Sequence, residues 1–244
     1  MTDKIIIVVP CYNEESRLLT QSFLGALDQD SDLHWLFVDD GSKDKTPEII
    51  ESMVRARPDR VLSHRIIRNS GKGEAVRQGL LMAIDQKAQV IGYYDADQAT
   101  PLSEIFRLLE ILKSQNKQFL LGSRVFLLGR DLQRQHWRYL LGRAFAFVAS
   151  RMLRLRVYDT QCGMKLLRVF PLLKSCLDEP FVSSWLFDVE LIQRLMTQGR
   201  LNTRDFFEEP LLQWTEVGGS KVKARAFATA LIDLFKIKLK SMGL

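Results

Sequence analysis

Apolar and polar positions alternate in blocks over the first 125 residues of the chain. Short runs rich in β-branched residues are followed by longer segments with apolar residues at helical spacing. The short runs predict five strands, within residues 4–10, 33–42, 61–69, 89–97 and 119–125. The longer segments predict helices over residues 13–27, 45–59, 73–87 and 101–115. Strands that alternate with helices predict an α/β fold, with a mostly parallel sheet flanked by helices.

Polar residues follow each of the predicted strands. The five strand ends read PCYNE, DDGS, RNSGKG, DADQ and GSR, whereas the strand bodies are apolar. Solvated loops would explain any one of these ends, but they explain less well why carboxylates and cations gather on one rim. In parallel sheets, ligands bind beyond the carboxyl ends of the strands. We therefore expect a binding site at this edge of the sheet.

The second half of the chain has a different character. An arginine-rich stretch runs from residue 125 to residue 157, with Asp131 as its single acidic residue. A basic amphipathic tail ends the chain, and the segments between read YDTQCGMKLL, SSWLFDVELIQRLM and FFEEPLLQWTEVGGSK. No linker-like composition separates the two halves, so we expect a single domain over residues 1–244.

Charge and cysteine content narrow the partners and the compartment. The formal net charge of +6 indicates an anionic partner, which leaves nucleotide phosphates, a membrane surface and nucleic acid open. The three cysteines have no metal-ligand spacing, which predicts reduced thiols in a cytosolic chain. No window reaches the ~18 uninterrupted apolar residues of a spanning helix, so we expect a protein that is soluble or lies on a surface.

Two carboxylates, Asp95 and Asp97, stand one residue apart at the end of the fourth predicted strand. A hard divalent cation such as Mg²⁺ or Mn²⁺ prefers carboxylate oxygens and keeps phosphate ligands. Alternatively, Asp97 caps the helix expected to begin near Pro101. Although D-x-D is a weak motif by itself, its place after an apolar strand favours metal binding.

Two other strand ends offer groups suited to a nucleotide. Asp39, after the second strand, would accept a hydrogen bond from a base or a ribose hydroxyl, whereas Asp40-Gly41 also fits a plain turn. Lys72, in NSGKGEA, would meet a diphosphate at the start of a helix, or would be a solvated lysine in a glycine-rich turn. The segment lacks the spacing of a P-loop, which disfavours a P-loop ATPase.

Eight segments of the chain share their order and spacing with a known family. They read VVPCYNEESRL, FVDDGSKDKT, RNSGKGEAVRQGL, YYDADQATP, GSR, DTQCGMKLL, FDVELI and WTEVGGSK. Together they resemble the inverting glycosyltransferases of family 2, which have the GT-A (Rossmann-like) fold. More narrowly, they are similar to the branch of dolichyl-phosphate glucosyltransferases and polyprenyl-phosphate sugar transferases. The match covers nearly the whole chain, and DTQCG and FDVEL are far more specific than D-x-D.

The resemblance implies transfer of a hexose, with glucose from UDP-glucose as the best match, to polyprenyl or dolichyl phosphate. Mg²⁺ or Mn²⁺ is the implied cofactor. Residues 1–125 would bind the nucleotide sugar, and residues 126–244 would face the acceptor and the membrane. Amphipathic helices in this second half would lie against the bilayer.

The resemblance also assigns roles to single residues. The nucleotide sugar would contact Pro10, Tyr12, Glu14, Asp39, Lys72 and Asp95. Asp97 would hold the metal, Arg124 of GSR would bind the acceptor phosphate, and Asp159 of DTQCG would lie near the sugar, which makes Arg124 and Asp159 the catalytic candidates. A phosphate acceptor is already ionised at neutral pH and needs positioning more than a base. A hydroxyl acceptor would need Asp159 as the base.

Three other functions compete with this interpretation. The first is a transferase that adds sugar to a glycan hydroxyl, although the Q-x-x-R-W signature of the processive relatives is absent from the sequence. The second is a basic nucleic-acid-binding module, which would interleave cations with exposed aromatic residues. The arginine-rich stretch instead has its apolar residues at helical spacing, so we expect no nucleic-acid partner. The third, a non-catalytic nucleotide-binding protein, would not need Asp95, Asp97, Arg124 and Asp159 together.

Two amphipathic segments are candidates for membrane attachment. Residues 132–153 carry an apolar stripe with flanking arginines, and residues 226–239 carry another beside Lys236, Lys238 and Lys240. Both stripes would fit an anionic interface, or would pack on the core. We expect a cytoplasmic protein held peripherally on the cytosolic face of a membrane, directly or through a separate membrane-protein partner.

Overall fold

The computed structural model describes residues 4–133, 136–217 and 225–241, without the side chains of residues 133, 136–141, 225–231 and 241. Within these residues, seven strands form one sheet in the order β3-β2-β1-β4-β7-β5-β8, and two short strands form a separate pair. The strands of the large sheet are β1 (Ile5–Cys11), β2 (Leu33–Asp40), β3 (Val61–Ile66), β4 (Val90–Tyr94), β5 (Phe119–Ser123), β7 (Met164–Arg168) and β8 (Phe206–Pro210). The short pair is β6 (Asp131–Gln133) and β9 (Gln213–Thr215).

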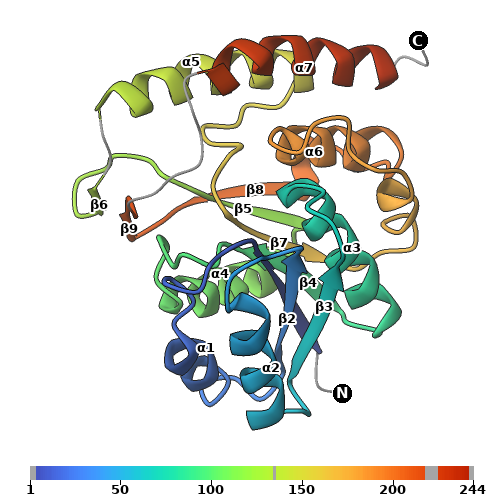
Figure 1. The fold of residues 1–244 in the computed structure, drawn as a ribbon. Coiled ribbons are helices and arrows are strands. Elements are labelled where there is room, and N and C mark those ends of the chain that lie inside the picture. The colour runs from blue at the N-terminus through green and yellow to red at the C-terminus, as the bar shows by residue number, and fades with distance from the viewer. Residues whose placement is uncertain (1–3, 134–135, 218–224, 242–244) are drawn as a thin grey trace.

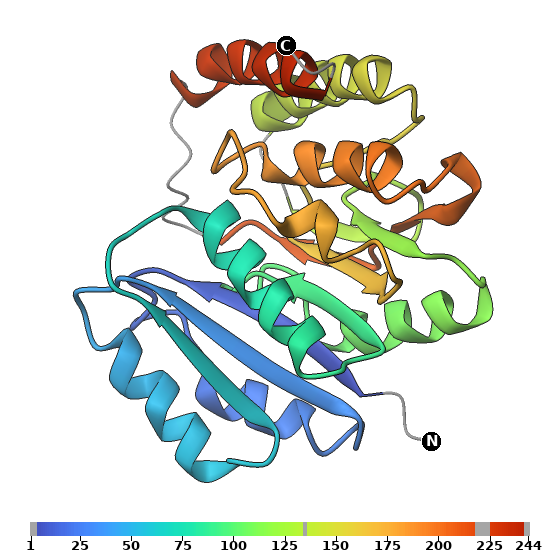
Figure 2. The same cartoon turned by 90° about the vertical axis from the view of Figure 1, so that its right-hand side faces the viewer.

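Helices cover both faces of the large sheet (Figure 1, Figure 2). They are α1 (Thr20–Ala26), α2 (Thr46–Ala56), α3 (Lys72–Asp85), α4 (Ser103–Ser114), α5 (His136–Leu153), α6 (Phe187–Thr197) and α7 (Arg225–Ser241). The predicted α/β fold is thereby confirmed, since every strand pairing except the two made by β7 is parallel.

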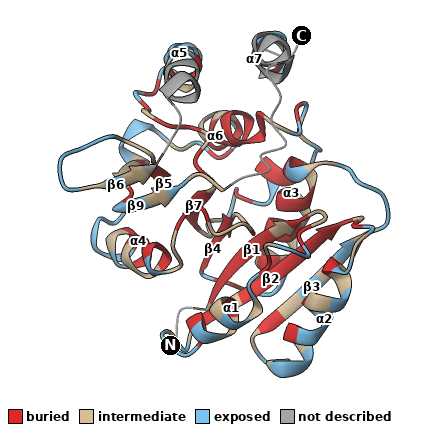
Figure 3. Ribbon diagram, turned by 60° about the vertical axis from the view of Figure 1, so that its left-hand side comes forward, coloured by how far each residue is buried: buried red, intermediate tan, exposed pale blue. Residues whose placement is uncertain are grey.

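Strands β1 and β4, in the middle of the sheet, carry no charged residue, and both of their faces are buried (Figure 3). Ile6 and Val8 of β1 belong to the core on the side of α3 and α6. Their neighbours Ile5 and Ile7 belong to the second core, on the side of α1, α2 and α4. Successive side chains of a strand point to opposite faces, so one continuous apolar run supplies both cores.

Strand β7 lies antiparallel between β4 and β5, an arrangement that the alternating pattern does not predict. Gly92 permits this close pairing, because a Cβ atom there would lie 2.4 Å from the carbonyl oxygen of Lys165. An antiparallel strand begins at the edge where its parallel neighbours end. The DTQCG segment, which leads into β7, is therefore brought to the carboxyl ends of β4 and β5.

Helix α1 begins at Thr20, so the prediction of a helix from Asn13 is wrong for its first seven residues. Asn13 has a φ of 51°, outside the right-handed helical region. The backbone N–H groups of Asn13 and Glu14 donate to Ser42 Oγ (2.9 Å) and Thr46 Oγ1 (2.8 Å), after β2. These long-range bonds hold the start of the segment beside β2, and the chain then makes a single turn, with Leu18 N donating to the carbonyl oxygen of Glu14 (2.9 Å).

Helices α5 and α7 lie at one end of the molecule, with α6 between them and the sheet (Figure 1, Figure 3). Each buries part of its surface and exposes the rest: Phe145 and Leu234 are buried, whereas Phe147 is 68% and Phe235 64% exposed. The predicted stripe also includes Trp137, Leu140 and Leu141, with Phe227 and Leu231 in the second segment, and these side chains lie outside the described residues. No helix in the described part of the chain has the length and apolar character needed to cross a bilayer.

Candidate active site

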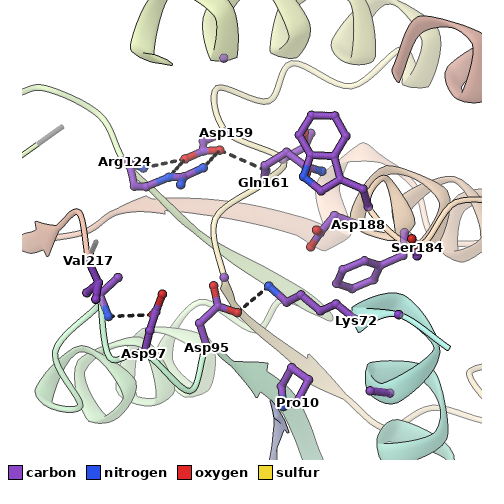
Figure 4. Close-up of a pocket in the computed structure, with 18 of the residues that line it drawn as sticks. Pro10, Lys72, Asp95, Asp97, Arg124, Asp159, Gln161, Ser184, Asp188 and Val217 are labelled. Atoms are coloured by element: carbon purple, nitrogen blue, oxygen red, sulfur yellow. Dashed lines mark hydrogen bonds and ion pairs between the residues drawn. The ribbon is translucent and has the colours of Figure 1, made fainter. Parts of the chain in front are cut away.

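A cavity of about 590 Å³ opens at the carboxyl edge of the sheet (Figure 4). Its walls come from the ends of β1, β4 and β5, the start of α3, the segment before β7, helix α5, the start of α6, and residues 214–217. The polar strand ends and the second-half motifs therefore meet in one place.

Most of the sequence-predicted residues lie in the wall of this cavity. They are Pro10, Tyr12, Glu14, Lys72, Asp95, Asp97, Arg124 and Asp159. Asp39 is not among the lining residues. Its buried carboxylate accepts a hydrogen bond from Ser42 N (3.0 Å) and pairs with Arg65 (3.2 Å).

Asp40 shapes the glycine-rich loop in front of α3 and was not singled out from the sequence. Its carboxylate accepts hydrogen bonds from the backbone N–H groups of Ser70 (2.7 Å) and Gly71 (2.8 Å). Burial raises its pKa, although these two bonds oppose the shift. Gly71 has a φ of 90° and no room for a side chain, since a Cβ there would lie 2.6 Å from Ser184 Cβ. The start of α3 is thus held against the cavity.

Lys72 and Asp95 form an ion pair across the floor of the cavity, with 2.5 Å between Nζ and Oδ1 (Figure 4). Partial desolvation lowers the pKa of Lys72, but the charges of Asp95 and Asp188 outweigh it and the pKa is raised. Gly163 of DTQCG makes room for this carboxylate, because a Cβ at that position would lie 1.9 Å from Asp95 Oδ2. The glycine of the motif therefore places Asp95 directly against the segment before β7.

Asp97 lies beside this pair and carries unbalanced negative charge. Burial and the nearby charge of Asp95 raise its pKa, while a hydrogen bond from Ala99 N (3.1 Å) opposes the shift. Within the described residues, no three side chains of the types that ligate metals gather at one point. Two carboxylates in a partly desolvated wall are nevertheless a donor set that suits a hard divalent cation completed by substrate phosphates.

Arg124 and Asp159 form a bidentate ion pair on the opposite side of the cavity from Lys72 (Figure 4). Arg124 Nε lies 2.6 Å from Asp159 Oδ2, and Nη2 lies 2.9 Å from Oδ1. Burial lowers the pKa of Arg124, but the charge of Asp159 and these hydrogen bonds outweigh it and raise the pKa. The guanidinium also lies 5.3 Å from the ring centroid of Trp214, in the WTEVGGSK segment.

The turn that carries Asp159 is held by residues with no sequence signal. Glu208 of β8 accepts hydrogen bonds from the backbone N–H groups of Tyr158 (2.8 Å) and Asp159 (2.7 Å). Burial raises the pKa of Glu208, and the charge of Asp159 adds to the shift. Arg143 of α5 donates to the carbonyl oxygen of Tyr158 (2.7 Å) and stacks on its ring. These contacts join α5 and β8 to the Arg124–Asp159 pair.

The start of α6 completes the wall with Trp185, Phe187 and Asp188. The sequence marks FDVEL as a specific segment but assigns it no role. A carboxylate in the first turn of a predicted helix would be consistent with simple capping. Only the folded chain shows that Asp188 faces the same cavity as Lys72 and Arg124.

Two ion pairs and two further carboxylates, Asp97 and Asp188, thus lie beyond the carboxyl ends of a mostly parallel sheet, where the ligands of such sheets bind. The chain belongs to glycosyl transferase family 2, whose family model matches residues 6–174. The expected family and the enzyme class are thereby confirmed.

Several curated relatives are dolichyl-phosphate beta-glucosyltransferases. The protein from Dictyostelium discoideum is 31% identical over 88% of this chain and 68% of its own length. The human protein is 32% identical over 91% of this chain and 70% of its own length. Among solved structures, glucosyl-3-phosphoglycerate synthase from Mycobacterium tuberculosis covers 99% of this chain and 81% of its own, with a TM-score of 0.65 and 19% identity. A structure of the same enzyme with Mn²⁺ and UDP-glucose has the same TM-score and covers 99% of this chain and 79% of its own, and the likeness shows the GT-A fold.

Proposed function

We propose that the protein transfers glucose from UDP-glucose to dolichyl or another polyprenyl phosphate, with inversion at the anomeric carbon. The observation that carries the proposal is the Arg124 guanidinium in the cavity wall, whose planar fork donates two hydrogen bonds to the carboxylate of Asp159. The same fork matches the oxygens of a phosphate. Relatives named dolichyl-phosphate beta-glucosyltransferase support this acceptor, and a fold neighbour bound to UDP-glucose supports the donor.

The donor would lie along the ends of β1 and β4. Pro10, Tyr12 and Glu14 line the cavity where the base and ribose would bind. Asp39 does not line it and would reach the ribose only by releasing Arg65. Lys72 would release Asp95 and turn to the diphosphate, since both groups already face the cavity.

We infer that Asp97, with Asp95 close by, would hold Mg²⁺ or Mn²⁺. The raised pKa of Asp97 supports this role, because a cation would balance the charge that burial and Asp95 make unfavourable. When bound, the ion would neutralise the charge of the departing nucleoside diphosphate. A fold neighbour crystallised with Mn²⁺ and UDP-glucose gives further support.

The acceptor phosphate would enter from the side of Arg124. It is already ionised at neutral pH, so its oxygen can attack the anomeric carbon without a base. Asp159 would then act by orienting Arg124. Its two oxygens already accept hydrogen bonds from Arg124 N, Nε and Nη2 and from Gln161 N, which leaves it poorly placed to take a proton.

The direct test is a panel of nucleotide hexoses, each incubated with purified protein, Mg²⁺ or Mn²⁺, and a short polyprenyl phosphate. We expect a glucosyl-phosphoryl lipid from UDP-glucose, identified by mass, and a sharp loss of product when EDTA removes the metal. A parallel reaction replaces the lipid with a glycan that offers only hydroxyl groups. Transfer to the glycan alone would contradict the lipid-phosphate acceptor.

We propose that α5 and α7 bring this site to a membrane surface on the cytosolic side. The outer sides of the two helices expose Phe147, Ile232 and Phe235. Lys236 and Lys240 of α7 lie near these side chains in sequence and are themselves exposed. Apolar side chains with nearby cations suit the interface of an anionic leaflet.

We expect binding to liposomes that rises with anionic lipid content and falls with salt, measured by sedimentation. The variant Phe147→Ser/Phe235→Ser removes two exposed apolar side chains and should weaken binding, because each contributes buried area in the interface. The control is Ile67→Ser, which removes a side chain that is 92% exposed but lies outside both helices. No binding under any condition would mean that attachment needs a separate membrane protein.

A further inference from the structure

Asp188, the second residue of α6, lies between the two ion pairs of the cavity (Figure 4). Its side chain is only 6% exposed on the folded chain, yet it forms part of the cavity wall. It is close enough to Lys72 for its charge to raise the lysine pKa. The first turn of a helix favours a negative charge at this position.

The buried ammonium of Lys165 and the buried hydroxyl of Tyr93 both contact the Asp188 carboxylate. Lys165 of β7 is 0% exposed, and its Nζ lies 2.5 Å from Asp188 Oδ1 and 2.5 Å from the carbonyl oxygen of Cys162. The hydroxyl of Tyr93 donates to the same Oδ1. In the described part of the chain, Oδ2 has no hydrogen bond, so one oxygen is anchored and the other is available at the cavity wall.

Stability alone does not account for this arrangement. Burying an ammonium and a carboxylate loses hydration that their attraction seldom exceeds, and an apolar pair of similar volume often gives an equally stable core. The arrangement does fix an oxygen at a defined point of the wall. In Figure 4 that point lies beside Lys72, with Arg124 across the cavity.

Polar groups without partners lie next to the same part of the wall. Thr160 Oγ1 and Gln161 Nε2 are buried and have no hydrogen-bond partner within the described residues. Both residues belong to the DTQCG segment and line the cavity, as does Trp185. Buried polar atoms in folded proteins are nearly always paired, with protein, water or a ligand, so these two are available to a polar ligand such as a sugar.

We propose that Asp188 binds hydroxyl groups of the transferred hexose and selects the sugar, with Lys165 and Tyr93 as its positioning residues. This inference rests on the proposed function, because the hexose must lie between the diphosphate and the acceptor phosphate. A carboxylate oxygen accepts strong, charge-assisted hydrogen bonds from sugar hydroxyls. In an epimer, one hydroxyl points away from Asp188, and the buried carboxylate oxygen then accepts no hydrogen bond from the sugar. The nucleotide sugar that carries this epimer is therefore a poorer substrate.

The test compares Asp188→Asn with wild type on UDP-glucose, UDP-galactose and UDP alone. Asparagine keeps the shape but loses the charge, so kcat/KM for UDP-glucose should fall about 10- to 100-fold. The ratio of kcat/KM for UDP-glucose to kcat/KM for UDP-galactose should also fall toward one. The Kd for UDP, measured by calorimetry, should change by less than about threefold, because UDP has no hexose. Lys165→Met should lower this ratio of kcat/KM values as well.

The matched control is Glu190→Gln, in the same first turn of α6. Glu190 is also buried but pairs with Arg194 away from the cavity, so this variant should keep the sugar preference even where it lowers stability. The double variant Asp188→Asn/Lys165→Met removes both buried charges and should fold where a single variant does not.

Three outcomes decide against the inference. It is overturned if Asp188→Asn keeps the wild-type donor ratio, or if the folded double variant regains the wild-type ratio, since the pair would then be structural. A wild-type protein that binds UDP but transfers no hexose from any donor overturns the proposed function instead, and this inference with it.

Discussion

Replacing Asp97 with alanine is expected to lower kcat by about 10²- to 10³-fold, the usual effect of losing one group that stabilises developing charge. The fold should survive. Asp97 accepts a hydrogen bond from Ala99 N, and Figure 4 marks a second contact, with Val217; at about 1 kcal/mol each, their loss should move the melting temperature by less than about 8 °C. The raised pKa of Asp97 shows that the folded chain disfavours its ionised form, which further limits the loss. Steady-state kinetics and thermal unfolding together check both expectations.

The pH dependence of the wild type gives an independent check on Asp97. Because burial and Asp95 raise its pKa, Asp97 takes up a proton at a higher pH than an ordinary aspartate. A metal binds only the deprotonated carboxylate, so activity should fall as the pH is lowered through this raised pKa. More Mn²⁺ should shift the fall to lower pH, since the metal competes with the proton.

The control for the charge itself is Asp59→Ala, which removes a carboxylate that is 69% exposed and distant from the cavity in sequence. It should leave kcat and the metal dependence unchanged. Full activity of Asp97→Ala, or wild-type activity that is insensitive to EDTA, would show that this carboxylate holds no metal.

Replacing Arg124 with alanine is expected to raise the KM for lipid phosphate more than the KM for the nucleotide sugar. Two charge-assisted hydrogen bonds, at about 1.5–3 kcal/mol each, correspond to a fall of about 10²-fold or more in kcat/KM for the acceptor. Arg124→Lys should restore only part of it, because an ammonium lacks the planar fork. Equal effects on both substrates would mean that Arg124 does not bind the acceptor.

Arg124→Ala should also destabilise the fold, so its effect on acceptor binding must be separated from its effect on stability. Asp159 is almost fully buried, and loss of Arg124 would remove the bidentate cation that balances its charge, which costs up to about 3–5 kcal/mol of unfolding free energy. Arg124→Ala/Asp159→Asn removes both charges and should recover most of that stability. We expect the double variant to keep the high KM for the acceptor. If it regains wild-type kinetics, the pair is structural only.

The strands of the first half could be predicted from the sequence because each is a short apolar run followed by polar residues. The five predicted strands all form, and the carboxyl edge that they share is where Lys72, Asp95, Asp97 and Arg124 meet. These residues are each within a few positions of a strand end. Local pattern is therefore enough to bring them to the same rim.

The resemblance of the quoted segments identified the family and the enzyme class for a different reason. The order and spacing of motifs can be read from a sequence without knowledge of the structure. The resemblance placed Asp159 in the site, although the segment is 35 residues from Arg124. It could not show that the two side chains grip each other, because a contact between distant segments depends on how the chain packs.

Tertiary structure alone decided the remaining parts of the site. The antiparallel insertion of β7 turns the DTQCG segment toward the cavity, and pairing across Gly92 makes that possible. The segment after Asn13 looks helical in sequence, yet it forms a single turn whose first residues are held by hydrogen bonds to the β2–α2 loop. Glu208 and Lys165 carry no local signal, since their partners lie tens of residues away and only the folded chain brings a charge, its partner and a cavity wall together.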